Sequence, residues 1–318
     1  MRVTDSAFPA RVTLVEVGPR DGLQNESQPL ATQVKVELIE RLVQAGLRKI
    51  EAAAFVSPRW VPQMADGAEV LSRVPRRSDI VYAALVPNLK GFEAAAAARA
   101  DEVVVFSAAS ETFCHKNINC SIAESIERFA PVCEAARRAA IAVRGSISCS
   151  LGCPYEGTVR PDAVARVARM MKDIGVQHVG VADTIGVGTP RATQQVFEAV
   201  LAVYPLQDLS GHFHDTYGQA LANVYACLEM GVSTFDASVA GLGGCPFARG
   251  ATGNVATEDV LYLMNGLQIE TGVDLDRLVQ AGQWISAVLG RKAATRAGNA
   301  IRARSEANAK GAVDASKP

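Results

Sequence analysis

The sequence predicts an α/β protein, a (β/α)8 TIM barrel with one or more extra helices near its C-terminal end. Three observations favour this fold. Eight apolar runs follow one another at intervals of roughly 32 residues, which is the size of one strand with its helix. Amphipathic stretches with helical spacing fill the gaps between the runs. The chain is 318 residues long, enough for one barrel of about 250 residues and a decoration.

The apolar runs have the pattern of strands that are buried on both faces, as in a parallel sheet. In three places an amphipathic stretch ends at a glycine and a run follows; these glycines are Gly46, Gly175 and Gly231. Glycine favours the left-handed conformation that often follows a helix. We expect strands, in order, at residues 12–17, 49–55, 80–86, 102–107, 145–150, 178–182, 210–214 and 234–240.

The helices complete the predicted architecture. Apolar residues with helical spacing surround Leu38 and Val224, and eight alternating units favour a closed barrel over a doubly wound sheet. The chain has neither a GxGxxG segment after the first strand nor a P-loop. A further helix is expected at residues 274–290. We therefore expect one catalytic domain over residues 1–297, helical decoration included, and a polar, mobile tail over residues 298–318.

Composition and charge argue against several classes of protein. Lys and Arg total 32 against 33 Asp and Glu, a net charge of −1, which does not suit a nucleic-acid or anionic membrane partner. Seven cysteines, an odd number, do not suggest a disulfide framework. No apolar run reaches the roughly 20 residues that span a bilayer, and the N-terminus has no targeting pattern. We expect a cytoplasmic protein that binds neither nucleic acid nor membrane.

Polar residues follow the strands where a barrel places its chemistry, and His212 and His214 are the most informative pair. Side chains two apart on a strand point the same way, roughly 6.6–7 Å apart along it, so both imidazoles can bind one cation. Asp21, after the first strand, supplies an opposing carboxylate. With no thiolate cluster near them, these ligand types suit Mg²⁺ or Mn²⁺. The sequence predicts a divalent metal held by Asp21, His212 and His214.

Three further residues are candidates for catalysis. Arg20 stays protonated and could stabilise a developing oxyanion, or it could form a structural ion pair. Glu51 lies in an apolar strand, where an unpaired carboxylate is costly, so it either pairs with Arg20 or orients a metal ligand or water. Cys245 lies in a loop with five glycines, residues 241–253. It could donate a proton from this loop, or be an inert loop cysteine.

Seven segments closely resemble the hydroxymethylglutaryl-CoA lyase family, within the superfamily of metal-dependent barrel lyases, synthases and carboxyltransferases. They span all but the two ends of the chain and cover the loops of the predicted active face. They are VEVGPRDGLQNE (15–26), FVSPRWVPQMAD (55–66), KNINCS (116–121), GCPYEG (152–157), ADTIGVGTP (182–190), HFHDTYGQALAN (212–223) and GLGGCPFARGATGNVATED (241–259).

The resemblance adds site residues that spacing alone does not indicate. It implies that the side-chain oxygen of Asn254 is a fourth metal ligand, and that Gln24 and Asp183 contact substrate. It further implies that Arg20 binds substrate and stabilises an enolate, that Glu51 belongs to the inner network, and that Cys245 is a catalytic loop residue. Relatives also suggest a homodimer.

The implied reaction is the cleavage of 3-hydroxy-3-methylglutaryl-CoA to acetyl-CoA and acetoacetate, a step of leucine degradation and ketone-body metabolism. A base takes the proton of the tertiary hydroxyl, the carbon–carbon bond breaks, and charge moves onto a thioester enolate. The residues leave the first proton acceptor open among Asp21, His212 and a bound water; we favour Asp21. A donor such as Cys245 then protonates the acetyl-CoA carbon.

Two departures from the family pattern leave the acyl specificity open. Residues 52–54 are three alanines and residues 180–182 read GVA, where relatives carry a serine. A lyase for a related 3-hydroxyacyl-CoA is therefore an alternative. A Claisen-type synthase and a scaffold protein are further alternatives. The synthase is disfavoured because such enzymes typically have Asn-Asp where this chain has Asp215-Thr216. The chain also lacks the C-terminal cysteine of animal relatives, so we predict no redox regulation between subunits.

Overall fold

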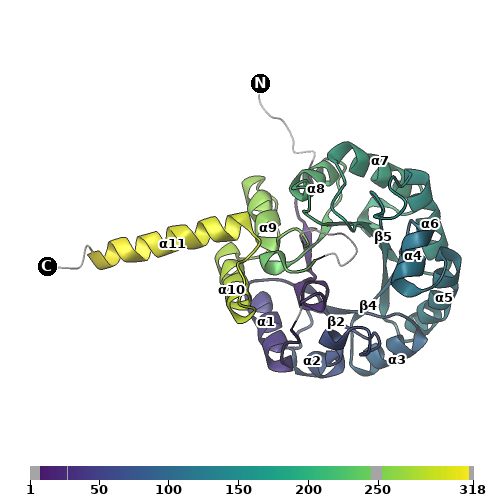
Figure 1. Ribbon diagram of the computed structural model, residues 1–318, viewed down its shortest axis with the longest axis horizontal. Coiled ribbons are helices and arrows are strands. Elements are labelled where there is room, and N and C mark those ends of the chain that lie inside the picture. Colours follow the sequence, from purple (N-terminus) through teal and green to yellow (C-terminus); the bar gives the residue numbers. More distant parts are fainter. Residues whose placement is uncertain (1–7, 27, 245–252, 315–318) are drawn as a thin grey trace.

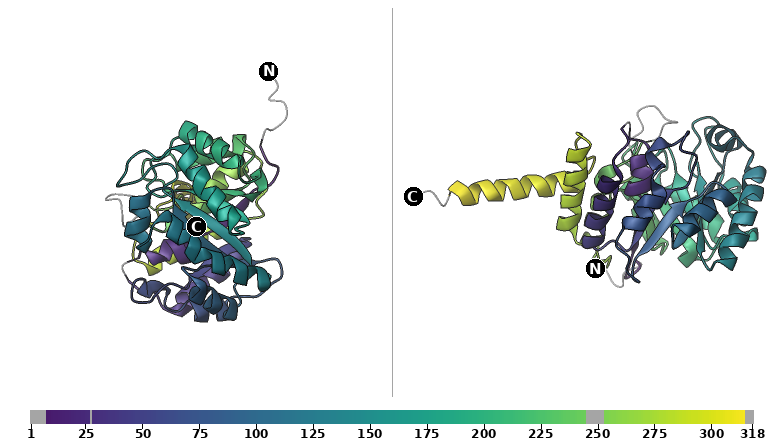
Figure 2. Two further views of the ribbon diagram at one scale, coloured as in Figure 1. Left: turned by 90° about the vertical axis from the view of Figure 1, so that its right-hand side faces the viewer. Right: turned by 90° about the horizontal axis from the view of Figure 1, so that it is seen from below.

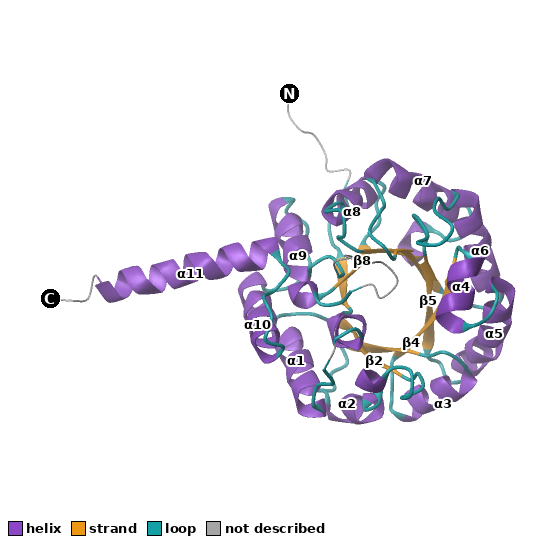
Figure 3. Ribbon diagram, viewed as in Figure 1, coloured by secondary structure: helices purple, strands orange, loops and turns teal. Residues whose placement is uncertain are grey.

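The computed structural model describes residues 8–26, 28–244 and 253–314, with side chains up to residue 308. Eight parallel strands close into a barrel in sequence order, and β8 pairs with β1 to complete the ring. Figure 3 shows this ring of strands inside a ring of helices. The predicted (β/α)8 barrel is confirmed.

The strands lie within or overlap all eight predicted runs. They are β1 (Thr13–Glu16), β2 (Lys49–Ala54), β3 (Val81–Leu85), β4 (Glu102–Ala108), β5 (Ala142–Ser148), β6 (His178–Asp183), β7 (Leu209–Phe213) and β8 (Thr234–Ala237). Two differ notably at their ends. β5 begins three residues earlier than predicted. The charged Arg144 interrupts the apolar pattern of the sequence, so the predicted strand started too late. β8 ends early because the chain turns at Ala240, whose φ is +57°.

Helices cover the outer face of the barrel. In chain order they are α1 (Thr32–Gln44), α2 (Gly67–Arg73), α3 (Leu89–Ala97), α5 (Ile122–Arg138), α6 (Pro161–Asp173), α7 (Pro190–Leu201), α8 (Ala220–Glu229) and α9 (Thr257–Gly266), with α4 (Glu111–Ile118) inserted after β4. Leu38 and Leu42 of α1 are fully buried in the hydrophobic core. Gly46, which follows α1, has φ +107°, and a Cβ there would lie 2.2 Å from the carbonyl oxygen of Gly272.

Short helices shape the turns. They are η1 (Gly18–Gly22), η2 (Pro62–Met64), η3 (Leu206–Asp208) and η4 (Val239–Gly241). Of these, η1 and η4 follow β1 and β8 directly, so they lie at the end of the barrel where the predicted site is. The predicted helix at residues 274–290 is confirmed as α10 (Leu275–Val288).

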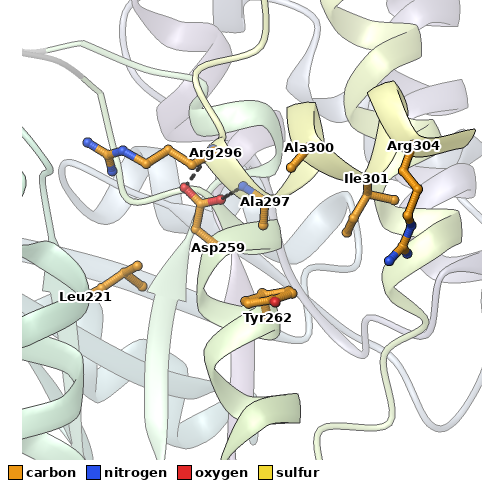
Figure 4. A pocket seen from close by; sticks show the side chains of 8 residues that line it. All are labelled: Leu221, Asp259, Tyr262, Arg296, Ala297, Ala300, Ile301 and Arg304. Carbon is orange, nitrogen blue, oxygen red and sulfur yellow. Dashed lines mark hydrogen bonds between the residues drawn. The ribbon is translucent and has the colours of Figure 1, made fainter. Parts of the chain in front are cut away.

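The C-terminal segment contains a helix that was not predicted, whereas the mobility of this segment stays a prediction. Residues 298–314, predicted to be part of a mobile tail, belong to helix α11 (Arg296–Asp314), which leaves the barrel and extends away from it (Figures 1 and 2). Asp259 accepts bonds from the backbone N–H groups of Arg296 (3.1 Å) and Ala297 (2.7 Å) at its start (Figure 4). The helix contains six alanines and three arginines, which are strong helix formers, so polarity alone did not predict it. Among the described helices, none has the length and apolarity of a membrane span.

Candidate active site

A cavity opens at the carboxyl-terminal end of the barrel, where the polar residues that follow the strands meet. Its volume is about 670 Å³. The residues that the sequence singles out and that line this cavity are Arg20, Asp21, Gln24, Glu51, His212 and His214. Residues distant in the sequence therefore converge at one end of the barrel, as the fold predicts.

The turn after β1 places two of these residues next to each other. In η1, the carbonyl oxygen of Val17 accepts bonds from the backbone N–H groups of Arg20 (3.2 Å), Asp21 (2.7 Å) and Gly22 (3.2 Å). The turn leaves no room at Gly22, where a Cβ would lie 2.7 Å from the Cβ of Leu242. Arg20 and Asp21 are thus fixed at the mouth of the barrel by a tightly packed backbone.

Asp21, His212 and His214 form a cluster that could hold a metal ion. One ligand atom from each lies within 4.8 Å of the others, and the two imidazole rings are 5.4 Å apart between centroids. Although burial favours the neutral acid, the positive charges of Arg20 and the histidines lower the pKa of Asp21 to about 2. Burial and the charge of His212 lower the pKa of His214 to about 4. At neutral pH the cluster therefore offers a carboxylate and a neutral His214.

Asn254 joins this cluster through the backbone. It forms an isolated antiparallel bridge with His214, and the N–H of Val255 donates to the carbonyl of Phe213 at 3.0 Å. The side-chain nitrogen of Asn254 donates to Asp21 Oδ2 at 2.8 Å and to the carbonyl of Leu242 at 3.3 Å. The amide oxygen of Asn254 is therefore the atom that can serve as a ligand.

The donor set fits a divalent cation. A carboxylate, imidazoles and an amide oxygen are ligands that Mg²⁺ and Mn²⁺ accept. In addition, Nδ1 of His214 is buried and has no hydrogen-bond partner among the described residues, although buried polar atoms are usually paired. A protein that held this cluster only for stability would be expected to satisfy that nitrogen.

Arg20 is bound to two carboxylates. Its Nε donates to Glu51 Oε1 at 2.6 Å and its Nη1 donates to Asp21 Oδ1 at 2.7 Å. Of the two roles considered for Glu51, the pairing with Arg20 is confirmed. Arg20 also forms the structural ion pair that was considered as its alternative role. Because Arg20 lines the cavity as well, this structural role is compatible with a role in catalysis.

The structure adds two buried charged residues that the sequence analysis missed. Arg144 of β5 and Asp236 of β8 both line the floor of the cavity, and Arg144 Nη1 donates to both carboxylate oxygens of Asp236, at 2.8 and 3.0 Å. Asp236 Oδ2 lies 3.2 Å from Nδ1 of His212. The signal was present in the sequence, since a charge within a buried strand is the pattern that indicated Glu51.

Asp183 is not placed where a substrate contact is expected. Its side chain is fully buried, and it is not among the described residues that line the cavity. Its carboxylate accepts bonds from the N–H groups of Val187 (3.1 Å) and Gly188 (2.8 Å), and burial raises the pKa of Asp183 to about 6. Because side chains alternate along a strand, Ala182 faces the cavity and Asp183 faces away. The structure assigns Asp183 to its own loop.

Two further predictions concern the role of Cys245 and the two departures from the family pattern. Cys245 lies outside the described residues, so its catalytic role stays a prediction. Of the two departures from the family pattern, residues 52–54 are buried and are not among the described lining residues, whereas Ala182 lines the cavity.

Across from the histidines, an apolar patch lines part of the cavity, beside polar and charged residues such as Lys116. Leu85 ends β3, Val104 and Phe106 lie on β4, and Phe113 lies on α4; all four line the cavity. In the strand order of the barrel, β3 and β4 lie opposite β7 and β8. The cavity thus has a charged, ligand-bearing side and, across from it, an apolar patch.

Comparisons with known proteins identify the family of this chain. The family model described as HMGL-like matches residues 11–285. A Pseudomonas aeruginosa protein named 3-hydroxy-3-isohexenylglutaryl-CoA/hydroxy-methylglutaryl-CoA lyase is 59% identical over 297 residues, which cover 93% of this chain and 99% of that protein. Hydroxymethylglutaryl-CoA lyase of Pseudomonas mevalonii is 58% identical, covering 92% and 98%. The crystal structure of hydroxymethylglutaryl-CoA lyase from Pseudomonas aeruginosa matches with a TM-score of 0.92 and 59% identity, covering 94% of this chain and all of that one.

Proposed function

Because the chain belongs to the HMGL-like family, we propose that it cleaves 3-hydroxy-3-methylglutaryl-CoA to acetyl-CoA and acetoacetate with a divalent cation. The observation that carries this proposal is the Asp21, His212 and His214 cluster beside Arg20 in one cavity. The relatives named above support the reaction, since both are named as lyases of this thioester.

The proposed reaction breaks the bond between C2 and C3 of the acyl chain. The tertiary hydroxyl on C3 loses its proton, and C3 becomes the ketone carbon of acetoacetate. The bonding electron pair moves onto C2 and the thioester carbonyl as an enolate. A proton added at C2 then gives acetyl-CoA, so atoms and charge balance.

The residues of the cavity have separate roles in this proposal. The cation, when bound, would hold the hydroxyl and carboxylate oxygens of the substrate and lower the pKa of that hydroxyl. Asp21 is ionised at neutral pH, because its pKa is about 2, and we assign it the hydroxyl proton. Arg20 is fixed by Glu51 at 2.6 Å and stabilises the enolate oxygen as charge develops there. Gln24 lines the cavity and is assigned to substrate binding, and Cys245 to the second proton.

A longer apolar branch on C3 is a second candidate substrate feature. The name of the Pseudomonas aeruginosa relative includes a 3-isohexenylglutaryl thioester, and the apolar patch formed by Leu85, Val104 and Phe106 could receive such a branch. Turnover of thioesters with C3 branches of increasing length tests this. In Val104→Phe, turnover of the long-branched substrate should fall much more than turnover of the methyl one. Equal losses would mean that this patch holds another part of the substrate.

The remaining expectations are part of the proposal. We infer Mg²⁺ or Mn²⁺ as the cation, Asn254 as its fourth protein ligand, and a catalytic domain that ends near residue 297. A homodimer, a place in leucine degradation and a cytoplasmic location stay predictions. The alternative of a Claisen-type synthase is less favoured, because both relatives named above are lyases. Product analysis with purified protein and 3-hydroxy-3-methylglutaryl-CoA tests the central proposal.

A further inference from the structure

One buried arginine connects the two halves of the site. Arg144 contacts carboxylates from three strands: Nη2 lies 2.9 Å from Glu51 Oε2, Nη1 lies 2.8 Å from Asp236 Oδ1, and Nε lies 3.3 Å from Glu102 Oε1. The side chain of Arg144 is only 3% exposed, and those of Glu51 and Asp236 are 2% and 8% exposed. Such a group of charges is stable in the interior only when its members stay together.

Two of these three carboxylates, those of Glu51 and Asp236, also contact a residue of the active site. Glu51 binds Arg20 with its other oxygen at 2.6 Å. Asp236 Oδ2 lies 3.2 Å from Nδ1 of His212. Arg144 therefore lies at the centre of a chain of contacts that runs from Arg20, in the turn after β1, to His212 on β7.

The contact between Asp236 and His212 selects one form of the imidazole. A neutral imidazole carries its proton on either ring nitrogen. Both carboxylate oxygens of Asp236 accept from Nη1 of Arg144, at 2.8 and 3.0 Å. A carboxylate that is paired in this way with a guanidinium can only accept from His212. It favours the proton on Nδ1 of His212 and leaves the lone pair of Nε2 for the cluster.

We propose that Asp236 is a positioning residue for metal binding: it holds His212 with its proton on Nδ1 and with Nε2 available to the cation. Arg144 fixes Asp236 and Glu51 together, so that His212 and Arg20 keep one relative position. Carboxylates that bind the far nitrogen of a ligating histidine commonly orient the ring and raise its basicity. The inference rests on the proposed metal site and extends it to two residues that are not ligands.

The first test needs no substitution. In metal-free protein labelled with ¹⁵N-histidine, the ring nitrogens of His212 report its tautomer by NMR, and they are assigned by their loss in His212→Asn. The proposal predicts a proton on Nδ1. A proton found mainly on Nε2 would overturn it, whatever the activity of the enzyme.

The second test compares two variants that each remove one carboxylate from Arg144. Asp236→Asn should weaken Mn²⁺ binding about 10–100-fold, measured by calorimetry, and should mix the tautomers of His212. Glu102→Gln is the matched control, because Glu102 contacts Arg144 but is not bonded to His212 in the structure. It should leave Mn²⁺ affinity within about twofold. Folding of both is checked by circular dichroism.

The outcomes separate this inference from the proposed function. If folded Asp236→Asn binds Mn²⁺ as tightly as the wild type and keeps the Nδ1 proton, Asp236 has no positioning role. If Asp236→Asn does not fold, the tautomer of His212 in the wild-type protein still decides whether Asp236 has the positioning role. If the wild type shows the predicted tautomer and binds Mn²⁺ but does not cleave 3-hydroxy-3-methylglutaryl-CoA, the positioning role stands and the substrate assignment fails.

Discussion

Glu51 holds Arg20 from the floor of the cavity, with Oε1 of the glutamate 2.6 Å from Nε of the arginine. A second bond joins Nη1 of Arg20 to Asp21 Oδ1 at 2.7 Å. The guanidinium is therefore fixed before any substrate arrives. A preorganised donor stabilises a developing charge without a cost of reorganisation at the moment of reaction, and this relationship underlies the first prediction.

Arg20→Gln should lower kcat by about 100–1000-fold, the range seen when one donor to a developing oxyanion is lost. Steady-state kinetics with 3-hydroxy-3-methylglutaryl-CoA measures the change, and circular dichroism checks the fold. Arg20→Lys serves as a comparison, because it keeps the charge but loses the fixed fork geometry, and it should have intermediate activity. Near wild-type turnover of Arg20→Gln would contradict the role in enolate stabilisation.

His214→Ala should weaken Mn²⁺ binding more than the roughly 10–100-fold that is typical of losing a partner of a ligand, because a ligand itself is removed. Calorimetric titration of metal-free protein measures the affinity. The matched control is His115→Ala. His115 is exposed and lies on α4, which follows β4, whereas the residues of the cluster lie at the ends of β1 and β7. Equal affinities of the two variants would exclude His214 as a ligand.

A pair of buried glutamates should make stability depend on pH. Burial raises the pKa of Glu258 to about 8 and that of Glu16 to about 7; in the unfolded chain both are near 4.5. Between these values the unfolded chain releases protons that the folded protein keeps, so stability falls as pH rises. Below the pKa of the glutamates in the unfolded chain, this loss of stability is absent. Above their pKa in the folded protein, the loss is complete.

Glu258→Gln removes one of these titrations while its side-chain oxygen can still accept from the N–H of Ala240, the partner of Glu258 at 3.0 Å. The decrease in Tm between pH 5 and pH 8.5 should then be several degrees smaller than in the wild type, since about 1 kcal/mol shifts Tm by roughly 2–4 °C in a chain of this size. Glu306→Gln, at an exposed position of α11, is the control. Identical pH profiles for wild type and Glu258→Gln would refute the prediction.

Deletion of residues 305–318 should change neither Tm nor kcat by more than the error of measurement. Within residues 296–308, whose side chains are described, the hydrogen bonds of α11 to the barrel are at its start, where Asp259 accepts from two backbone N–H groups (Figure 4), and residues 302–308 are exposed. Thermal unfolding and the lyase assay measure both quantities. A large loss of activity would show that the catalytic domain extends past residue 297 into this helix.

The barrel could be predicted because its signal is repeated. Each of eight apolar runs contains or overlaps a strand, and the glycine at position 46 has the left-handed φ that its place after α1 suggests. The C-terminal helix was missed because small and charged residues suit both an exposed helix and a tail. Only the helix propensity of the segment could have separated the two.

The site could be predicted only in part, for two physical reasons. His212, His214 and Asp21 follow from strand spacing, whereas Asn254 reaches them through a bridge between backbone segments 40 residues apart, which no local pattern encodes. Asp183 was misplaced because an acid at the end of a strand can face either side. In this strand, the side chain of Ala182 faces the cavity, and that of the next residue, Asp183, faces away from it.

The most direct test of the central claim is acetoacetate formation from 3-hydroxy-3-methylglutaryl-CoA by protein freed of metal and then titrated with Mg²⁺ or Mn²⁺. The account predicts acetoacetate and acetyl-CoA in equal amounts, only after the cation is added, and complete loss of both when EDTA is in excess. Equal turnover with and without the cation, or cation-dependent turnover of other acyl-CoA thioesters but none of this one, would contradict it.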